Sequence, residues 1–444
     1  MLQLRNSILR LVVAQPTRVH IIAVIRRHQH QQYQLFHTRN TVSEAKNETS
    51  KKENEIWIKR KPLPKTTSIK YTIPSDPYLL ASKFQKLEKE GKLNDAVALI
   101  MQSKTRNQSQ VLWNLVIDAY AKKGGLSRAL RAYTEMRKRG FKPTQTTFTA
   151  LIRACALSEG EKCVPMAEQV YKSMRDYGIE PSIIHINSLL AVYQRKHSVQ
   201  AMLNVYNQLP RDGPKAPSLA TYTILMSVLR REIHNRLEEL KNEPVKPGSE
   251  DTELKKRVDR RTAHIIKNIR DTFDTLFLAW HSYTEDAMRR LEEPRNDTEP
   301  LLIDAHVVNI MLKTCHSVYA TNRALGRRGL RAAEQIYGLE RNLKAEKIDS
   351  ENADADPNAL PLAARLRPIA PTENSEPAQP IQSKRINIID NVTIGLVLDL
   401  CERDKEYTKA IRFWRSLETH FAKEIEPYKS VYTEKIGKLK SYLK

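Results

Sequence analysis

The stretch that decides the fold runs from residue 110 to residue 144 and reads QVLWNLVIDAYAKKGGLSRALRAYTEMRKRGFKPT. Its anchors are Ala129, Tyr133, Met136, Gly140 and Pro143. The same five residue types recur 38 positions later, and a close variant recurs about 35 positions after that. These two later sets are Ala167, Tyr171, Met174, Gly178, Pro181 and Met202, Tyr206, Leu209, Gly213, Pro217. A period of this length indicates an array of stacked repeats.

Each copy predicts two helices joined by a short turn. In the first copy an apolar stripe runs from Trp113 to Tyr120, and Gly124 and Gly125 interrupt it. Ser127 is placed to cap the second helix. A single hairpin of this kind cannot bury its stripe, so neighbouring hairpins must stack. The expected fold is all-α, a right-handed α-solenoid with a continuous concave face.

The residues of these copies resemble the pentatricopeptide repeat. The resemblance rests on WNLVIDAY at 113–120, ALRAYTEMRKRGFKP at 129–143 and YKSMRDYGIEP at 171–181. Tetratricopeptide arrays, which bind peptides, have a similar period, but the Gly-x-x-Pro ending and the Trp/Phe/Tyr-Asn/Thr opening favour the pentatricopeptide version. The resemblance implies a P-type protein without a catalytic C-terminal domain. Within an array at 78–229, we expect clear repeats at 110–144, 145–182 and 183–218.

The N-terminal composition predicts a targeting segment followed by a linker. Residues 1–43 contain arginines among aliphatic residues and no acidic residue, which is typical of a mitochondrial transit peptide. The alternative is a basic tail that binds nucleic acid directly. Residues 44–77 are basic and contain prolines, so we interpret them as a linker.

The C-terminal half departs from the regular period. Residues 230–300 predict an interrupted helical segment with a long amphipathic helix that ends near Trp280. Its basic start, at 255–261, fits either a lengthened repeat helix or a dedicated phosphate-binding helix. The remaining segments are a degenerate repeat-like unit at 301–341, a disordered insertion at 342–383, and a repeat-like unit with a capping helix at 384–444.

Charge points to a polyanionic partner. The formal net charge is +23, and residues 110–218 alone hold 16 basic and 8 acidic side chains. Clustered Lys and Arg attract phosphates and release their counterions. The apolar run near the start, Ile21 to Ile25, is far shorter than the roughly 20 residues that a membrane span requires, so we expect none.

No enzyme signature is present in the sequence. It lacks the His-x-Glu and CxxC motifs of zinc deaminases, a glycine-rich phosphate loop and an aspartate cluster of the nuclease type. The cysteines and several histidines have no ligand spacing; they are Cys155, Cys163, Cys315, Cys401, His281, His306 and His316. We therefore expect neither a catalytic site, nor a metal, nor a cofactor.

The resemblance implies that each repeat reads one base of single-stranded RNA with two or three side chains. Carried over by position, the fifth residues are Asn114, Thr149, Asn187, Thr223 and Asn309, and the last residues are Thr144, Ser182 and Ser218. The second residues, which would pack between bases, are Val111, Thr146, Ile184 and Ala220. In the family Asn leans toward pyrimidines and Thr toward purines.

Three features qualify this assignment. Asn and Thr also satisfy backbone groups at helix starts, so the series has a purely structural alternative. The last positions lack the family's usual Asp or Asn, and Gly395 in the closing unit cannot read a base. At one base per repeat, five positions distinguish only about a thousand sequences.

The sequence thus predicts a mitochondrial matrix protein that binds single-stranded RNA, either messenger or ribosomal, in organellar gene expression. The process would be RNA processing, stability or translation, in company with other RNA-processing proteins or the mitochondrial ribosome. A second hypothesis is a structural component or assembly factor of that ribosome, bound to ribosomal RNA. A third is a peptide-binding helical-repeat scaffold.

Overall fold

A computed structural model describes residues 71–160, 162–242, 252–337 and 388–443. The regular secondary structure of these residues is helical throughout, which confirms the expected all-α solenoid of helical hairpins. The predicted transit peptide, residues 44–70 of the predicted linker and the predicted insertion at 342–383 lie outside the described residues.

The described helices form seven consecutive hairpins, each with a first and a second helix. The first helices are α4 (Pro77–Lys89), α6 (Gln110–Lys122), α8 (Gln145–Leu157), α10 (Ile183–Arg195), α12 (Leu219–Asn242), α14 (Ala305–Val318) and α18 (Asn391–Asp404). Their partners are α5 (Leu93–Gln102), α7 (Leu126–Lys138), α9 (Cys163–Ser173), α11 (Val199–Tyr206), α13 (Thr252–Glu292), α15 (Arg323–Gly326) with α16 (Arg328–Tyr337), and α19 (Tyr407–His420). Two helices follow the last hairpin, α20 (Ala422–Ile425) and α21 (Lys429–Ser441). Three short 3-10 turns complete the set, η2 (Thr105–Asn107), η3 (Arg175–Tyr177) and η6 (Glu426–Tyr428).

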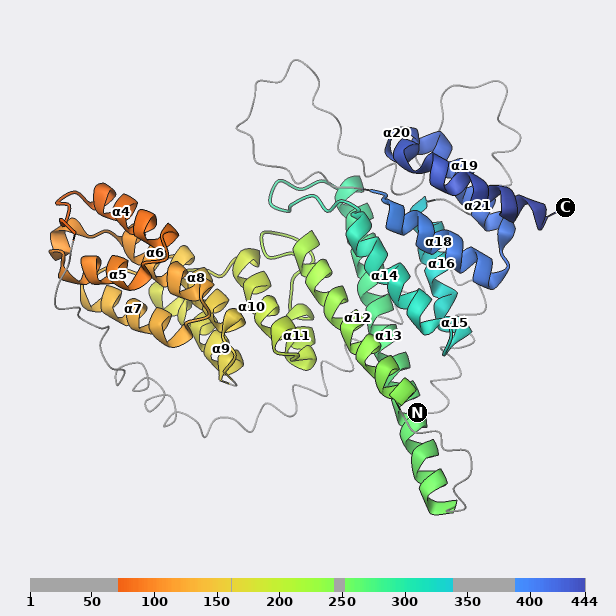
Figure 1. Cartoon of the computed structure of the whole chain (residues 1–444), viewed down its shortest axis with the longest axis horizontal. Helices are drawn as coiled ribbons and strands as arrows, with labels where there is room; N and C mark the ends of the chain where they lie inside the picture. Colours follow the sequence, from red (N-terminus) through yellow and green to blue (C-terminus); the bar gives the residue numbers. More distant parts are fainter. Residues whose placement is uncertain (1–70, 161, 243–251, 338–387, 444) are drawn as a thin grey trace.

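The hairpins stack in chain order, from α4 at one end of the molecule to α21 at the other (Figure 1). Each first helix packs on the next first helix, from α4 to α18. One cluster of buried apolar side chains runs through all the hairpins, from Leu80 to Leu439. Because every hairpin shares its apolar stripe with its neighbours, the core is continuous along the array.

The turn between α6 and α7 packs closely against the next unit. Gly124 adopts a φ of +67°, which favours glycine. A Cβ at this position would lie 3.0 Å from the carbonyl oxygen of Leu157 in the next first helix. The turn therefore has both a conformational and a packing reason to be glycine.

The predicted cap of α7 is wrong. The helix begins after Gly125, where no side chain accepts a capping bond, and Ser127 lies exposed within the first turn. The double glycine makes a tight turn in which Gly125 N donates to Tyr120 O at 3.0 Å. This turn places the start of the helix two residues earlier than the serine predicts.

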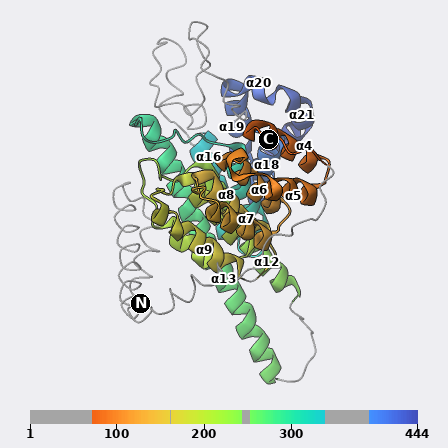
Figure 2. The ribbon, with the colours of Figure 1, turned by 90° about the vertical axis from the view of Figure 1, so that its left-hand side faces the viewer.

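The fifth hairpin is lengthened into an arm. Helix α12 continues the apolar stripe of its unit through Leu229, Ile233 and Leu237, and α13 runs back along it. The two helices project beyond the array at their far end (Figures 1 and 2). The boundary expected at 229/230 falls inside α12, because apolar spacing carries the helix across it. The expected stripe on α13 is buried, including Phe273 and Trp280.

Helix α21 covers the exposed side of the last first helix, α18. Tyr432 Oη donates to the backbone carbonyl and side-chain oxygen of Asn391, at 2.9 and 2.7 Å. Beneath it, a Cβ on Gly395 would lie 3.2 Å from Tyr432 Oη. The glycine in the fifth position of this unit thus accommodates the helix that closes the array.

The four cysteines are buried free thiols. Burial raises the pKa of Cys155 and of Cys401 to about 12, so both remain protonated and weakly nucleophilic. Among the described helices, none combines the length and apolarity that crossing a bilayer requires.

Tyr133 and Tyr171 occupy the same place in successive repeats but differ in burial. Tyr133 is 4% exposed and its ring centroid lies 6.3 Å from that of Phe148, whereas Tyr171 is partly exposed. We expect Tyr133→Ala to lower the free energy of unfolding by about 3–5 kcal/mol, the range for loss of a buried aromatic side chain. Tyr171→Ala should cost clearly less. Urea unfolding of the two variants checks this order, and equal losses would contradict it.

Candidate nucleic-acid interface

The residue directly before each first helix, here called the last-position residue, organises the helix start. Before α8, Thr144 Oγ1 accepts from Thr147 N at 3.4 Å, while Thr147 Oγ1 accepts from Thr144 N at 2.9 Å. Ser218 and Thr221 repeat the arrangement before α12, at 3.5 and 3.0 Å. Such reciprocal bonds form a capping box, which satisfies two backbone donors at a helix start.

The fifth-position asparagines join these boxes across the boundary between units. Asn114 Nδ2 donates to Thr144 Oγ1 at 3.0 Å, and Thr147 Oγ1 donates to Asn114 Oδ1 at 2.5 Å. In the third repeat, Asn187 Nδ2 donates to the Ser218 hydroxyl at 3.0 Å and Thr221 donates to Asn187 Oδ1 at 2.7 Å. We call this set of three side chains a clamp. Each clamp brings a predicted fifth residue and a predicted last residue into direct contact.

A third clamp lies further along the array and is closed to solvent. Asn309 Nδ2 donates to both carboxylate oxygens of Asp390, at 3.0 and 2.9 Å, and Thr393 Oγ1 lies 2.9 Å from Asn309 Oδ1. Asn309 is only 5% exposed, whereas Asn114 and Asn187 are partly exposed. The amide of Asn309 is therefore occupied and buried, which argues against it as a base-contacting group.

The fifth-position threonines form no clamp. Thr149 Oγ1 donates to Gln145 O at 3.0 Å, within its own helix, and Thr223 does the same to Leu219 O at 2.8 Å. Their hydroxyls therefore keep lone pairs for an incoming donor. The expected pair of Thr149 with Ser182 is not joined by a hydrogen bond in the structure.

Ser182 instead pairs with a histidine. His185 takes the place that Thr147 and Thr221 occupy elsewhere: Ser182 N donates to its Nδ1 at 3.2 Å, and its Nε2 lies 3.3 Å from Gln145 O. Burial lowers the pKa of His185, which keeps the ring neutral. A neutral ring with the proton on Nε2 satisfies both contacts.

Second-position residues project outward beside the fifth positions. Val111 and Ile184 are 65% and 64% exposed, and Thr146 and Ala220 are also exposed. The same place in the first hairpin holds Tyr78, which is 80% exposed. Exposed side chains at one repeated position, of which Tyr78 is aromatic and Val111 and Ile184 are aliphatic, provide apolar contact surfaces beside the fifth positions.

Basic side chains follow the same helices toward their C-terminal ends. Lys122, Arg195 and Arg231 each lie thirteen residues after the residue that directly precedes their first helix, and all three are exposed. Lys122 is paired with Asp118 at 3.1 Å, and Arg153 from the next unit shares that carboxylate at 2.9 Å. The bridge from Arg153 to Asp118 shows that charged side chains of α6 and α8 meet on one surface.

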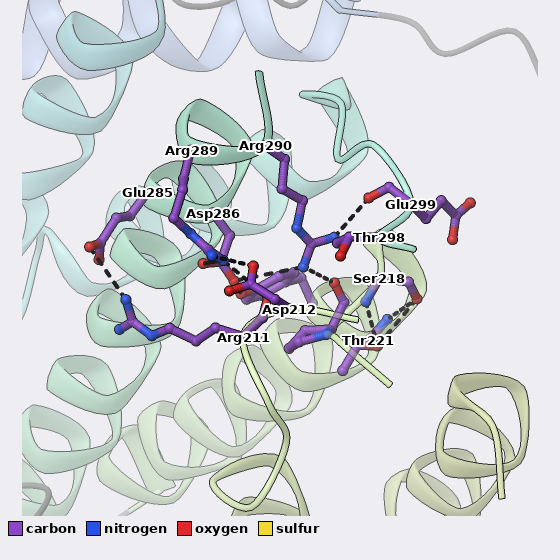
Figure 3. A network of polar contacts seen from close by, with 12 residues as sticks. Arg211, Asp212, Ser218, Thr221, Glu285, Asp286, Arg289, Arg290, Thr298 and Glu299 are labelled. Carbon is purple, nitrogen blue, oxygen red and sulfur yellow. Dashed lines mark hydrogen bonds and ion pairs between the residues drawn. The ribbon is translucent and has the colours of Figure 1, made fainter. Parts of the chain in front are cut away.

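The C-terminal end of α13 holds the segment that leads into α12. Arg290, which is 8% exposed, donates to Pro217 O at 2.9 Å and to Glu299 O at 3.0 Å. On α13 the neighbouring Asp286 accepts from Tyr222 Oη at 2.7 Å and pairs with Arg289 at 3.0 Å. Figure 3 shows this network beside Ser218 and Thr221. The arm thus fixes the backbone that carries the last position of the third repeat.

Sequence reasoning missed the third member of each clamp, as well as Asp390 in the closed clamp and the exposed Tyr78. The hydroxyls of Thr147, Thr221 and Thr393 have a readable signal, because each follows a Ser, Thr or Asp by three residues, which is the spacing of a capping box. Tyr78 was hidden because its hairpin lacks the glycine and proline spacing of the clear repeats.

Within the described ranges, no group of three or more His, Cys, Asp or Glu side chains is placed to hold a metal ion. A pocket of about 160 Å³ lies at the C-terminal end of α13, where Asp212, Arg289, Arg290 and Arg295 contribute to its lining. Arg289 and Arg295 pair there with the carboxylate of Asp212. The cluster serves the network around α13 and shows no catalytic arrangement.

Comparison with protein families identifies the repeats. A model described as "PPR repeat family" matches residues 108–157, and one described as "Pentatricopeptide repeat domain" matches residues 169–231. A mitochondrial pentatricopeptide repeat-containing protein of Arabidopsis thaliana is 27% identical over 146 residues, which is 32% of this chain and 15% of that protein. A chloroplastic one from the same plant is 30% identical over 129 residues, 29% of this chain and 14% of its own. The chain thus matches only a small part of these longer relatives.

Among solved structures, the pentatricopeptide repeat protein PPR10 in complex with an 18-nt psaJ RNA element is 16% identical. The alignment covers 78% of this chain and 54% of PPR10, with a TM-score of 0.31. A crystal structure of PPR10 from maize gives the same TM-score. At this score the superposition does not place individual residues of one chain on the other.

The buried contacts of Arg290 should contribute more to stability than a solvent-exposed ion pair does. Arg290 also lies 3.9 Å from the carboxylate of buried Asp286. We expect Arg290→Ala to lower the free energy of unfolding by about 3–5 kcal/mol, because it removes this partner of Asp286 and leaves two carbonyls without a donor. Arg211→Ala is the matched control: it removes a pair with Glu285 at 3.5 Å in which both side chains are about 40% exposed. That loss should stay below about 1 kcal/mol. Chemical unfolding of both variants measures the difference, and similar values would contradict the structural role of Arg290.

Proposed function

The chain is a pentatricopeptide repeat protein, and from that premise we propose that it binds single-stranded RNA in mitochondrial gene expression. The observation that carries the proposal is the row of fifth-position side chains on successive first helices, which alternates clamped Asn with unclamped Thr. Four members are partly exposed: Asn114, Thr149, Asn187 and Thr223. Each retains hydrogen-bonding capacity toward solvent.

The chemistry of this row suits unpaired bases. Reading a base requires groups that contact its edge and apolar surfaces that contact its faces. The fifth positions supply the first, and the exposed second positions, such as Val111 and Ile184, supply the second. Lys122, Arg195 and Arg231 lie along the same helices and would neutralise phosphates. These features together favour RNA over a peptide as the ligand.

The composition of the N-terminal residues and the similarity to a mitochondrial protein support a mitochondrial location. The first 43 residues have the arginine-rich, acid-free composition of a transit peptide, and one Arabidopsis relative is named as mitochondrial. We propose the matrix as the site of action and binding without bond chemistry as the mechanism. Bound RNA would be shielded from nucleases or presented to other proteins.

The short row limits what the protein can select alone. Four readable positions distinguish only about 250 sequences at one base per repeat. We therefore propose that it acts with partners or also recognises RNA structure. The projecting arm of α12 and α13 favours one specific alternative, a component or assembly factor of the mitochondrial ribosome. Crosslinking in purified mitochondria separates the two roles, since reads confined to ribosomal RNA would exclude a messenger-specific one.

RNA binding should depend on salt through the basic row. We expect Lys122→Gln, Arg195→Gln and Arg231→Gln together to reduce the slope of log affinity against log salt by about 2, given roughly 0.7 per phosphate contact on single strands. The control removes the same charge from second helices, through Arg128→Gln, Lys138→Gln and Lys172→Gln. Filter binding at several salt concentrations measures both slopes. If the first-helix variant and the second-helix control gave equal slopes, the RNA would bind elsewhere on the protein. If the wild-type protein bound no RNA at low salt, the peptide-scaffold hypothesis would be favoured.

Base preference should follow the fifth positions. Asn114→Thr and Asn187→Thr convert two clamped positions into the unclamped type already present at Thr149 and Thr223. We expect a binding selection from randomised RNA to show a shift from pyrimidine toward purine at two places, with the salt slope unchanged. An unaltered preference would show that these asparagines serve only the helix starts.

A further inference from the structure

Each of the two open clamps contains a threonine, Thr147 or Thr221, that contacts the fifth-position asparagine as well as capping its own helix. We propose that Thr147 and Thr221 are positioning residues that fix the orientation of the Asn114 and Asn187 amides, and so determine which edge group each presents to RNA. The inference rests on the proposed RNA binding. It assigns base selectivity at these two places to a third residue that belongs to the following repeat.

An asparagine amide has two ends of similar shape, so its orientation must come from its neighbours. The last-position hydroxyls of Thr144 and Ser218 accept a helix N–H at only 3.4 and 3.5 Å, so their donor and acceptor roles are less constrained than those of the threonines in the next helix. In the closed clamp the orientation of the amide is fixed, because an ionised Asp390 can only accept hydrogen bonds and therefore faces Asn309 Nδ2. The two open clamps lack such a carboxylate.

In the open clamps the deciding contact is made by the threonine of the next helix. Thr147 Oγ1 accepts the backbone N–H of Thr144 at 2.9 Å and donates to Asn114 Oδ1 at 2.5 Å, a contact shorter than the 3.1 Å between Thr147 Oγ1 and Thr144 Oγ1. Thr221 Oγ1 likewise accepts from Ser218 N at 3.0 Å and donates to Asn187 Oδ1 at 2.7 Å. Both threonines are fully buried. Oδ1 is thus held toward the threonine and Nδ2 toward the last-position hydroxyl.

This geometry leaves a defined set of groups for a ligand. Each amide keeps one N–H and one lone pair on Oδ1 outside the clamp. Without the threonine hydroxyl, both orientations of the amide have comparable partners, and the amide offers a mixture of two patterns. The threonines therefore supply the orientation that an acidic last-position residue provides in the closed clamp.

The test removes the hydroxyl while keeping the shape. Thr147→Val should reduce the base preference opposite Asn114 by about five-fold, the effect of one hydrogen bond, while preferences at the other positions persist. Thr221→Val should do the same at the position of Asn187. Thr147→Ser, which restores a hydroxyl, should recover the wild-type preference. The readout is a binding selection from an RNA library randomised at each position, with thermal unfolding recorded for every variant.

Thr393→Val is the matched control. It removes the equivalent hydroxyl from the closed clamp, where Asn309 is 5% exposed, so it should lower stability without changing any base preference. A wild-type protein that binds no RNA would refute the proposed function itself. Normal binding with an unchanged preference in both Thr147→Val and Thr221→Val would overturn only the positioning role. Failure of Thr147→Ser to recover preference, or a changed preference in Thr393→Val, would also overturn it.

Discussion

The hydrogen bonds at the start of each first helix are the interaction on which the structure depends. A last-position side chain such as Thr144 begins one helix and contacts an asparagine of the preceding helix, so starting a helix and aligning two units are the same event. Packing alone fixes the distance between helices but leaves their rotation and sliding less determined. The clamps remove this freedom at the surface where the second and fifth positions meet solvent.

Much of the architecture was predictable from spacing. The glycine and proline period around Gly140 and Pro143 predicted helical hairpins, and buried apolar spacing along α13 predicted the lengthened helix through Phe273 and Trp280. The boundary inside α12 was missed because a polar composition after Leu229 hid a stripe that continues through Ile233 and Leu237. The cap at Ser127 was misplaced because the double glycine turns the chain earlier.

The sequence predicted which residues occupy the site but not whether each of them is exposed to solvent. Position within the repeat located Asn114 and Asn309 equally well, but only the structure shows that one is open and the other buried. Exposure depends on neighbours that are far away in sequence, such as Asp390, which lies 81 positions after Asn309. Sequence also could not show that the arm supports the array, since the contact of Arg290 with Pro217 O joins residues 73 positions apart.

Each clamp draws its side chains from two adjacent repeats, and this has a consequence for how such proteins grow and can be rebuilt. A duplication that copied residues 110–144 would carry Asn114 and Thr144 but not Thr147. The copy would then form a complete clamp only if the residues after it supplied a hydroxyl at the place of Thr147. A segment cut between the first-helix midpoints, from about Asn114 to just past Thr147, would carry its clamp intact. The transferable module is therefore offset from the repeat as its sequence period defines it.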